Sequence, residues 1–169
     1  MSAIWGQVSW NEEIADEVTQ TMRLPYEQKC KLDKIRECSQ KHFYMGCGIQ
    51  FVTKESVMEQ LPIFDRERNC SVTIDGLLDN RQELMELLQV ADDTLPDGSL
   101  MYQAYCKWGM DCLRHFCGLF SMAVYKFSTK RLYLAVDQVS ARCNSEQLLL
   151  NNRVAVLFLR VREDKREAY

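Results

Sequence analysis

The first two residues of the chain could form a catalytic N-terminus. Removal of Met1 would leave Ser2 with a free α-amine beside its own hydroxyl. An α-amine has a reference pKa of about 7.7–8.0, so it can act as the general base that activates this hydroxyl as a nucleophile. Many chains begin Met-Ser for no catalytic reason, so a merely processed terminus is the alternative interpretation.

Two aspartates lie where they could complete such a site. Asp75 and Gly76 end an alternating segment, and the turn predicted there could present a backbone N–H to a developing oxyanion. Asp97 opens a predicted helix and could bind the ammonium group of a substrate. An ordinary turn and a helix N-cap are the structural alternatives for these two positions.

The other polar candidates are scattered along the chain. Asp137 and Arg142 follow a predicted strand and could form a structural ion pair or contact a neighbouring domain. His42 and His115 are isolated, and the eight cysteines include no C-x-x-C pair. We therefore expect no metal site, and the lack of a glycine-rich phosphate loop predicts no cofactor.

The composition indicates an ordinary globular protein in a reducing compartment. The 169 residues are 47% hydrophobic and carry a net charge of -3, which argues against nonspecific nucleic-acid binding. No apolar run approaches the roughly 18–20 residues of a membrane span. The N-terminus lacks a basic signal region, so we expect a cytoplasmic location in which the cysteines are reduced and act as small buried hydrophobes.

The elements that must position these residues come in blocks of strands and helices. The expected strands cover residues 2–10, 43–53, 70–75, 120–127, 132–137 and 154–161. The expected helices cover residues 12–22, with Asn11 as N-cap, then 26–39 after a break at Pro25, 81–90 and 97–108, the last one stopped by Gly109. Strands, then paired helices, then strands predict an α+β fold with segregated layers.

Five segments follow the order of one protein family. The chain opens Met1-Ser2-Ala3-Ile4-Trp5-Gly6, which is similar to the opening Met-Cys-Gly-Ile-x-Gly of that family. The other four are Val72-Thr73-Ile74-Asp75-Gly76 with Leu78-Asp79-Asn80-Arg81, Pro96-Asp97 leading to Trp108-Gly109, residues 118–125, and residues 131–142. This order resembles the glutaminase domain of asparagine synthetase-like proteins, which are class II glutamine amidotransferases of the N-terminal nucleophile hydrolase type.

The resemblance implies a fold and a reaction. The fold would be the four-layer αββα sandwich of N-terminal nucleophile hydrolases, formed by a domain spanning residues 1–143. The reaction would be hydrolysis of the glutamine side-chain amide, with ammonia passing to a synthetase domain. Residues 144–169 match neither the continuation of the family nor a synthetase domain, and we expect a divergent strand followed by a charged tail there.

The resemblance also assigns roles to five residues. Ser2 takes the position of the cysteine nucleophile, and Asp75 and Gly76 take the positions of the oxyanion-hole pair, where the family has asparagine and glycine. Gln50 aligns with the arginine that clamps the substrate carboxylate, and Asp97 aligns with the aspartate that binds the substrate ammonium. Because Ser2, Asp75 and Gln50 are substitutions, glutaminase activity is expected to be impaired or lost.

Three functions remain open at this stage. The first is a degenerate glutaminase domain that binds glutamine or a similar small molecule and works beside a separate synthetase. The second is an active serine N-terminal nucleophile hydrolase acting on another amide. The third is a non-catalytic interaction module, and none of the three excludes a homo-oligomer.

Overall fold

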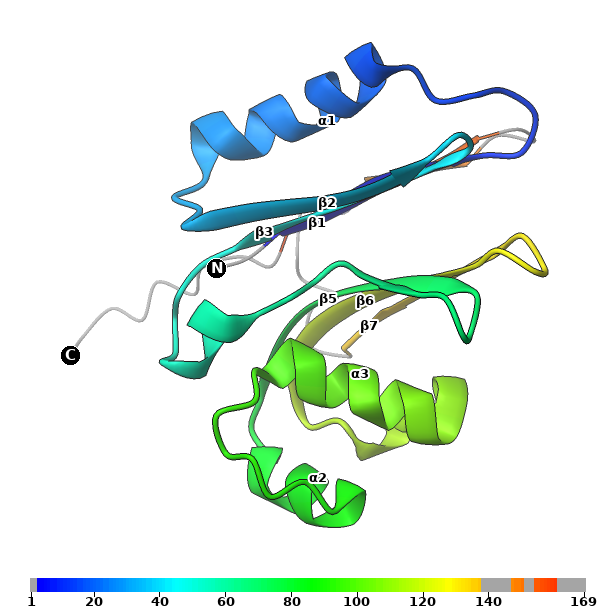
Figure 1. Cartoon of the computed structure of the whole chain (residues 1–169). Coiled ribbons are helices and arrows are strands. Elements are labelled where there is room, and N and C mark those ends of the chain that lie inside the picture. The colour runs from blue at the N-terminus through cyan, green and yellow to red at the C-terminus, as the bar shows by residue number, and fades with distance from the viewer. Residues whose placement is uncertain (1–2, 138–146, 151–153, 161–169) are drawn as a thin grey trace.

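Two stacked β-sheets form the centre of the computed structural model, which describes residues 3–137, 147–150 and 154–160 (Figure 1). The five-stranded sheet, here sheet A, has the order β2-β3-β1-β9-β8. Its strands are β1 (Ala3–Ser9), β2 (Lys34–Gln40), β3 (Phe43–Ile49), β8 (Gln147–Leu150) and β9 (Val154–Arg160). The four-stranded sheet, here sheet B, has the order β4-β5-β6-β7, with β4 (Ile63–Asp65), β5 (Cys70–Leu78), β6 (Gly118–Lys126) and β7 (Arg131–Val136).

Helices cover the outer face of each sheet. The helix α1 (Asp16–Lys29) lies over sheet A, whereas α2 (Arg81–Leu88) and α3 (Asp97–Trp108) lie on the far side of sheet B (Figure 1). Two short 3-10 helices, η1 (Glu55–Met58) and η2 (Gly109–His115), connect these layers. The layer order helix, sheet, sheet, helix confirms the predicted α+β sandwich of the αββα type.

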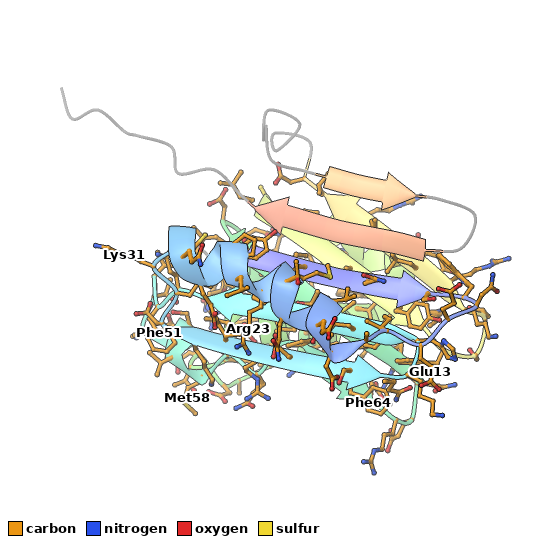
Figure 2. All side chains as sticks on the ribbon, turned by 90° about the horizontal axis from the view of Figure 1, so that it is seen from above. Glu13, Arg23, Lys31, Phe51, Met58 and Phe64 are labelled. Carbon is orange, nitrogen blue, oxygen red and sulfur yellow. The ribbon has the colours of Figure 1, made fainter. Side chains whose placement is uncertain are left out.

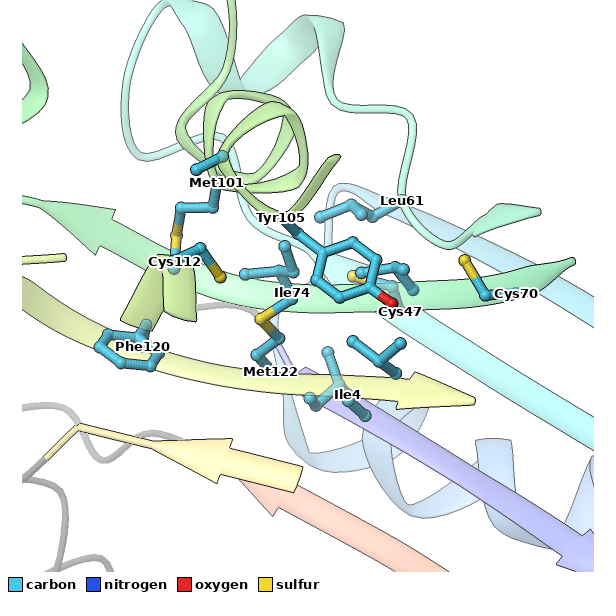
Figure 3. Close-up of a cluster of buried hydrophobic side chains, with 14 of the residues drawn as sticks. Ile4, Cys47, Leu61, Cys70, Ile74, Met101, Tyr105, Cys112, Phe120 and Met122 are labelled. Carbon is cyan, nitrogen blue, oxygen red and sulfur yellow. The ribbon is translucent and has the colours of Figure 1, made fainter. Parts of the chain in front are cut away.

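Side-chain alternation on β1 and β3 separates two buried clusters. Trp5 faces α1, where its ring stacks on Tyr26 with centroids 4.6 Å apart and its indole N–H donates to Tyr44. The neighbouring Ile4 points the other way and joins the main core with Ile74 and Met122 (Figure 3). A strand that is buried on both faces suits the central position of β1 in sheet A.

The helix α1 begins and ends later than predicted. Residues 11–15 run along the β2–β3 hairpin instead, because the Ile14 N–H bonds to the Lys41 carbonyl. Pro25, expected to break the helix, lies inside it. Pro25 and Leu24 are exposed, while Met22 and Tyr26 are buried one turn apart, so packing against sheet A offsets the hydrogen bond that proline cannot make. Figure 2 shows this helix, with Arg23 labelled, lying across the strands of sheet A.

The predicted helix over residues 26–39 is wrong beyond Lys29, where α1 ends. Lys34–Gln40 forms the edge strand β2, which pairs with β3 in the register Lys34↔Ile49 through Gln40↔Phe43. One face of β2 carries Glu37 toward α1, where Arg23 lies 3.4 Å from its carboxylate. The strand is polar on both faces, so it lacks the hydrophobic alternation by which strands are recognised.

The remaining elements follow the sequence prediction closely. The helix α3 spans the predicted residues, and Gly109 ends it with a φ of +61°. The helix α2 ends two residues early at a left-handed Gln89. Strands β6, β7 and β9 appear where expected, and β9 lies antiparallel to β1.

Candidate functional site

The candidate residues gather at one end of the sandwich. There β1 begins beside the end of β3, because Ala3 pairs with Gly48. The Leu78 N–H, at the end of β5, donates to the Asp97 carboxylate at the start of α3 over 2.9 Å. Glu59 joins these two groups, since its carbonyl accepts a hydrogen bond from Lys34, which pairs with Ile49 at the end of β3, and its carboxylate accepts one from Ser99 in the first turn of α3. Ser2 lies outside the described residues, so its predicted role as a nucleophile stays a prediction.

Asp75 and Gly76 lie within a strand and not in a turn, contrary to the prediction. The strand β5 continues to Leu78 because it stays paired with β6, in the register Asp75↔Ser121 and Gly76↔Phe120. A Cβ on Gly76 would lie 2.8 Å from the Met101 sulfur of α3, so this face of β5 packs closely against the helix at Gly76. Alternation along β5 then turns Asp75 to the opposite face, toward sheet A.

The surroundings of Cys47 support this orientation of Asp75. Cys47 is fully buried on the face of β3 that looks toward sheet B. Burial is the main cause that raises the pKa of its thiol, and the nearby Asp75 carboxylate raises it further. The Asp75 carboxylate therefore lies between the two sheets, close to the end of β3.

Asp97 is held by its own protein neighbours. One carboxylate oxygen accepts the Leu78 N–H and the other accepts a hydrogen bond from Arg81. Arg81 also donates to the backbone carbonyls of Asp93 and Leu95, so it ties the start of α2 to the loop before α3. Asp97 is not the N-cap of α3, which is Pro96. A substrate ammonium would have to share this carboxylate with a guanidinium.

Gln50 is the first residue after β3 and is half-buried. Its carbonyl accepts the Val52 N–H over 3.0 Å, which turns the chain away from the sheet. The side chain of Gln50 carries no charge, so it can bind a ligand carboxylate only through a neutral hydrogen bond.

Glu59 is a buried carboxylate that the sequence analysis missed. Its carboxylate accepts hydrogen bonds from the Gln60 N–H and the Ser99 hydroxyl, both with a donor–acceptor distance of 3.0 Å, and from the N–H groups of Gly98 and Leu61. It thereby caps α3 from a distant loop, since no side chain of the helix does so. Gly98 makes room for it, because a Cβ there would lie 2.5 Å from Glu59 Oε2. An isolated loop glutamate carries no sequence signal of such a role.

The ionisation of Glu59 should make stability depend on pH. Burial raises the pKa of Glu59 above its ordinary value, against the opposing effect of its hydrogen bonds. The folded state then binds the proton more tightly than the unfolded state, so this contribution to stability falls as pH rises from about 4.3 through the raised pKa. We expect the stability advantage of the wild type over Glu59→Gln to shrink as the pH rises from about 4.3 through the raised pKa of Glu59.

Urea unfolding of both proteins at matched pH values measures that difference. Asp93→Asn, which changes an exposed carboxylate in the loop before α3, is the control and should show no comparable trend. A Glu59→Gln difference that grows with pH would contradict the raised pKa.

Other site types find little support in the described residues. The described residues include no group of three or more histidine, cysteine, aspartate or glutamate side chains placed to hold a metal ion. No helix among residues 3–137, 147–150 and 154–160 is long and apolar enough to cross a membrane. A cavity of about 520 Å³ lies at the opposite end of the sandwich and contains none of the predicted site residues. It is lined by Gln40, Lys41, His42, Phe43, Tyr125, Phe127 and Lys130.

Comparison with solved structures gives the fold a known counterpart. The chain is similar to the glutamine phosphoribosylpyrophosphate amidotransferase from B. subtilis, solved in complex with ADP and GMP. The TM-score is 0.66 at 11% sequence identity, over 92% of this chain and 41% of that one. The chain thus spans about two-fifths of the length of that enzyme, and the likeness concerns the fold.

Comparison at the level of sequence identifies the family. No curated protein matches the chain. The family model described as "Glutamine amidotransferase domain" matches residues 50–143, a segment that includes Gln50, Asp75, Gly76 and Asp97. This confirms the predicted resemblance to a class II glutamine amidotransferase domain. Because the match spans more than half of the 169 residues, the chain belongs to the glutamine amidotransferase domain family.

Proposed function

We propose that this chain is a glutaminase-like domain that binds glutamine or a similar amino-acid-like molecule and hydrolyses its amide slowly or not at all. The observation that carries the proposal is the carboxylate of Asp75 on the inner face of β5, near the end of β3. An oxyanion formed there would meet a negative group where a side-chain amide would donate a hydrogen bond. Loss of one such donor costs about 10²–10³ in rate, before any repulsion is added.

Two further residues support weak catalysis. A hydroxyl is far less ionised than a thiol near neutral pH, so Ser2 is a weaker nucleophile than cysteine would be. Asp97 pairs with Arg81 and already accepts a hydrogen bond on each carboxylate oxygen, so it attracts a substrate ammonium less strongly than an unpaired carboxylate would. Ser2 thus weakens catalysis, and the pairing of Asp97 with Arg81 weakens binding of the ligand ammonium group.

The relation to asparagine synthetase-like proteins belongs to the same proposal. It rests on the order of the five sequence segments, from the N-terminus to residue 142. In this interpretation the domain works in the cytoplasm beside a separate synthetase, either as a weak source of ammonia or as a binding partner.

Ammonia release from L-glutamine tests the proposal. We expect wild-type protein to release ammonia at the rate of Ser2→Ala or only slightly above it, while calorimetry detects glutamine binding to both. Fast turnover by the wild type that disappears in Ser2→Ala would show that the serine is an efficient nucleophile and would contradict the proposal. Absence of any glutamine binding would favour a pure interaction module.

Mass spectrometry of the purified protein separates these outcomes further. An active serine nucleophile requires removal of Met1, because only then is the α-amine of Ser2 free to act as a base. A protein that retains Met1 cannot use this mechanism, whatever amide is offered.

A further inference from the structure

Two hairpin turns, one from each sheet, border the cavity at the end of the sandwich opposite to the candidate site (Figure 1). The β2–β3 turn contributes Lys41 and His42, and the β6–β7 turn contributes Lys130. Phe43 of sheet A and Tyr125 of sheet B line the inner end of the cavity, where their rings stack with centroids 5.1 Å apart. The volume of about 520 Å³ lies within the range of ~300–1,000 Å³ that small-molecule sites occupy.

Two neighbouring residues at the end of β1 hold both turns in place. The Ser9 N–H donates to the His42 carbonyl over 2.9 Å, and the Trp10 indole N–H donates to the Lys130 carbonyl over 3.1 Å. The Glu12 carbonyl accepts the His42 Nδ1–H over 2.8 Å, since a carbonyl can only accept, and this contact fixes the imidazole ring. The walls of the cavity are thus positioned before a ligand binds, which lowers the entropic cost of binding.

Aromatic rings form the apolar wall of the cavity. Phe127 meets the rings of Phe43, Phe64 and Tyr125 at angles of 72–83°, with centroids 4.9–5.4 Å apart. Phe127 itself is only half-buried, so part of its surface remains open to a ligand. A flat ring placed in the cavity would extend this cluster, and aromatic pairs of this kind raise affinity about two- to tenfold beyond the burial of apolar area.

The side chains that line the cavity include basic groups and no carboxylate. No aspartate or glutamate of the described residues lies within ion-pair distance of the Lys130 ammonium. The Lys41 ammonium lies 3.0 Å from the Glu13 carboxylate, so that pair adds little net charge. Lys130 is therefore the cation that an anionic ligand would meet here.

We propose that this cavity is a second ligand site, which binds a small aromatic carboxylate. The ring of the ligand packs against Phe127, and its carboxylate pairs with the Lys130 ammonium. A neutral aromatic compound lacks the ion pair, and an aliphatic carboxylate lacks the contact between rings, so both bind less tightly. The site lies at the other end of the sandwich from Gly76 and Asp97 and does not depend on glutamine binding.

Three compounds of similar size test the two parts of this recognition. Phenylacetate carries both the ring and the charge, phenylacetamide lacks the charge, and cyclohexylacetate lacks the aromatic ring. In a ¹H–¹⁵N titration of the wild-type protein, phenylacetate should bind most tightly, in the millimolar range usual for so small a ligand. It should shift the amide resonances of residues 40–43 and 125–130 and leave those of Gly48 and Gly76 in place.

Variants give the expected size of each contribution. Lys130→Gln should weaken phenylacetate binding about three- to fivefold, as for an exposed ion pair, and should leave phenylacetamide binding unchanged. Phe127→Leu should weaken both phenyl compounds about two- to tenfold and change cyclohexylacetate binding much less. Lys31→Gln makes the same change of charge on an exposed residue before β2, at the candidate-site end, and should bind all three compounds like the wild type.

Three results would overturn the inference. Equal affinity of the wild type for phenylacetate and phenylacetamide, or phenylacetate binding that Lys130→Gln does not weaken, would show that the cavity does not select an anion. Phenylacetate shifts centred on Gly48 and Gly76 would place the ligand at the candidate site instead. No shift with any of the three compounds would show that the cavity binds no such ligand. The proposed function would stand in each case, because glutamine binding is measured separately.

Discussion

Replacing Gly118 by alanine is expected to lower the free energy of unfolding by more than about 4 kcal/mol, enough to prevent folding of a marginally stable domain. Gly118 begins β6 with a φ of +139°, a conformation that residues with a side chain rarely adopt. A Cβ there would lie 2.1 Å from the Leu77 carbonyl oxygen, which is backbone and cannot move aside without disturbing β5. Thermal and urea unfolding of the purified variant measure the loss.

Gly109→Ala provides the matched control. Gly109 also has a positive φ, of +61°, but nothing lies within 4 Å of the position of its Cβ. Alanine at this φ of +61° and ψ of −141°, a combination adopted mainly by glycine, should cost about 1–3 kcal/mol. A Gly118→Ala variant no less stable than Gly109→Ala would show that β5 and β6 can separate near Leu77. That result would also weaken the placement of Asp75, two residues before Leu77 in the same strand.

Replacing Arg81 by methionine is expected to destabilise the protein by about 2–4 kcal/mol. The change keeps most of the apolar stem of the side chain but removes its bonds to the Asp97 carboxylate and to two backbone carbonyls. The side chains of Arg81 and Asp97 are only 22% and 14% exposed, so solvent screens this pair weakly. Urea unfolding gives the difference in free energy.

A double-mutant cycle with Asp97→Asn isolates the pair itself. We expect the two substitutions together to cost clearly less than the sum of the single changes, because each one already breaks the same ion pair. Arg114→Met is the control, since Arg114 is 84% exposed and lies 3.8 Å from Asp111, and it should change stability by no more than about 0.5 kcal/mol. If the losses in the free energy of unfolding for Arg81→Met and Asp97→Asn simply add, the two side chains are not energetically coupled and this account of the ion pair is wrong.

Local signals in the sequence predict sheet B and the helices that cover it well. The helix α3 has a clear apolar stripe and a terminal Gly109, and β6 and β7 form a short hairpin. These elements depend mainly on neighbouring residues, so a linear pattern is enough to locate them. The layer order followed from the family resemblance and not from the pattern itself.

The structure of sheet A and of the helix α1 that covers it depends on contacts between residues far apart in the sequence. Pro25 continues α1 because Tyr26 stacks on Trp5, more than twenty residues earlier in the chain. The edge strand β2 has polar residues on both faces because α1 and sheet B cover it only partly. Ile35 and Cys38 are spaced three residues apart, as on one face of a helix, so the sequence alone predicts a helix there. Only the pairing of this segment with β3 shows that it is a strand.

The candidate site shows the same division. Asp75 and Gly76 were identified from their order along the chain, but their place within β5 depends on β6, so a turn was expected instead. Glu59 carries no local signal, because its partners Gly98 and Ser99 come from α3. The partnership of Asp97 with Arg81 also required the structure, since sixteen residues separate them.

The role of Asp75 can be measured most directly in a protein that carries a better nucleophile. Ammonia release from L-glutamine is compared between Ser2→Cys and Ser2→Cys with Asp75→Asn, and Asp79→Asn in the same background controls for the change of charge. If the carboxylate of Asp75 suppresses amide hydrolysis, Asp75→Asn should raise the rate by about 10²–10³, and Asp79→Asn should not change it. Equal rates with aspartate and asparagine at position 75 would contradict the account.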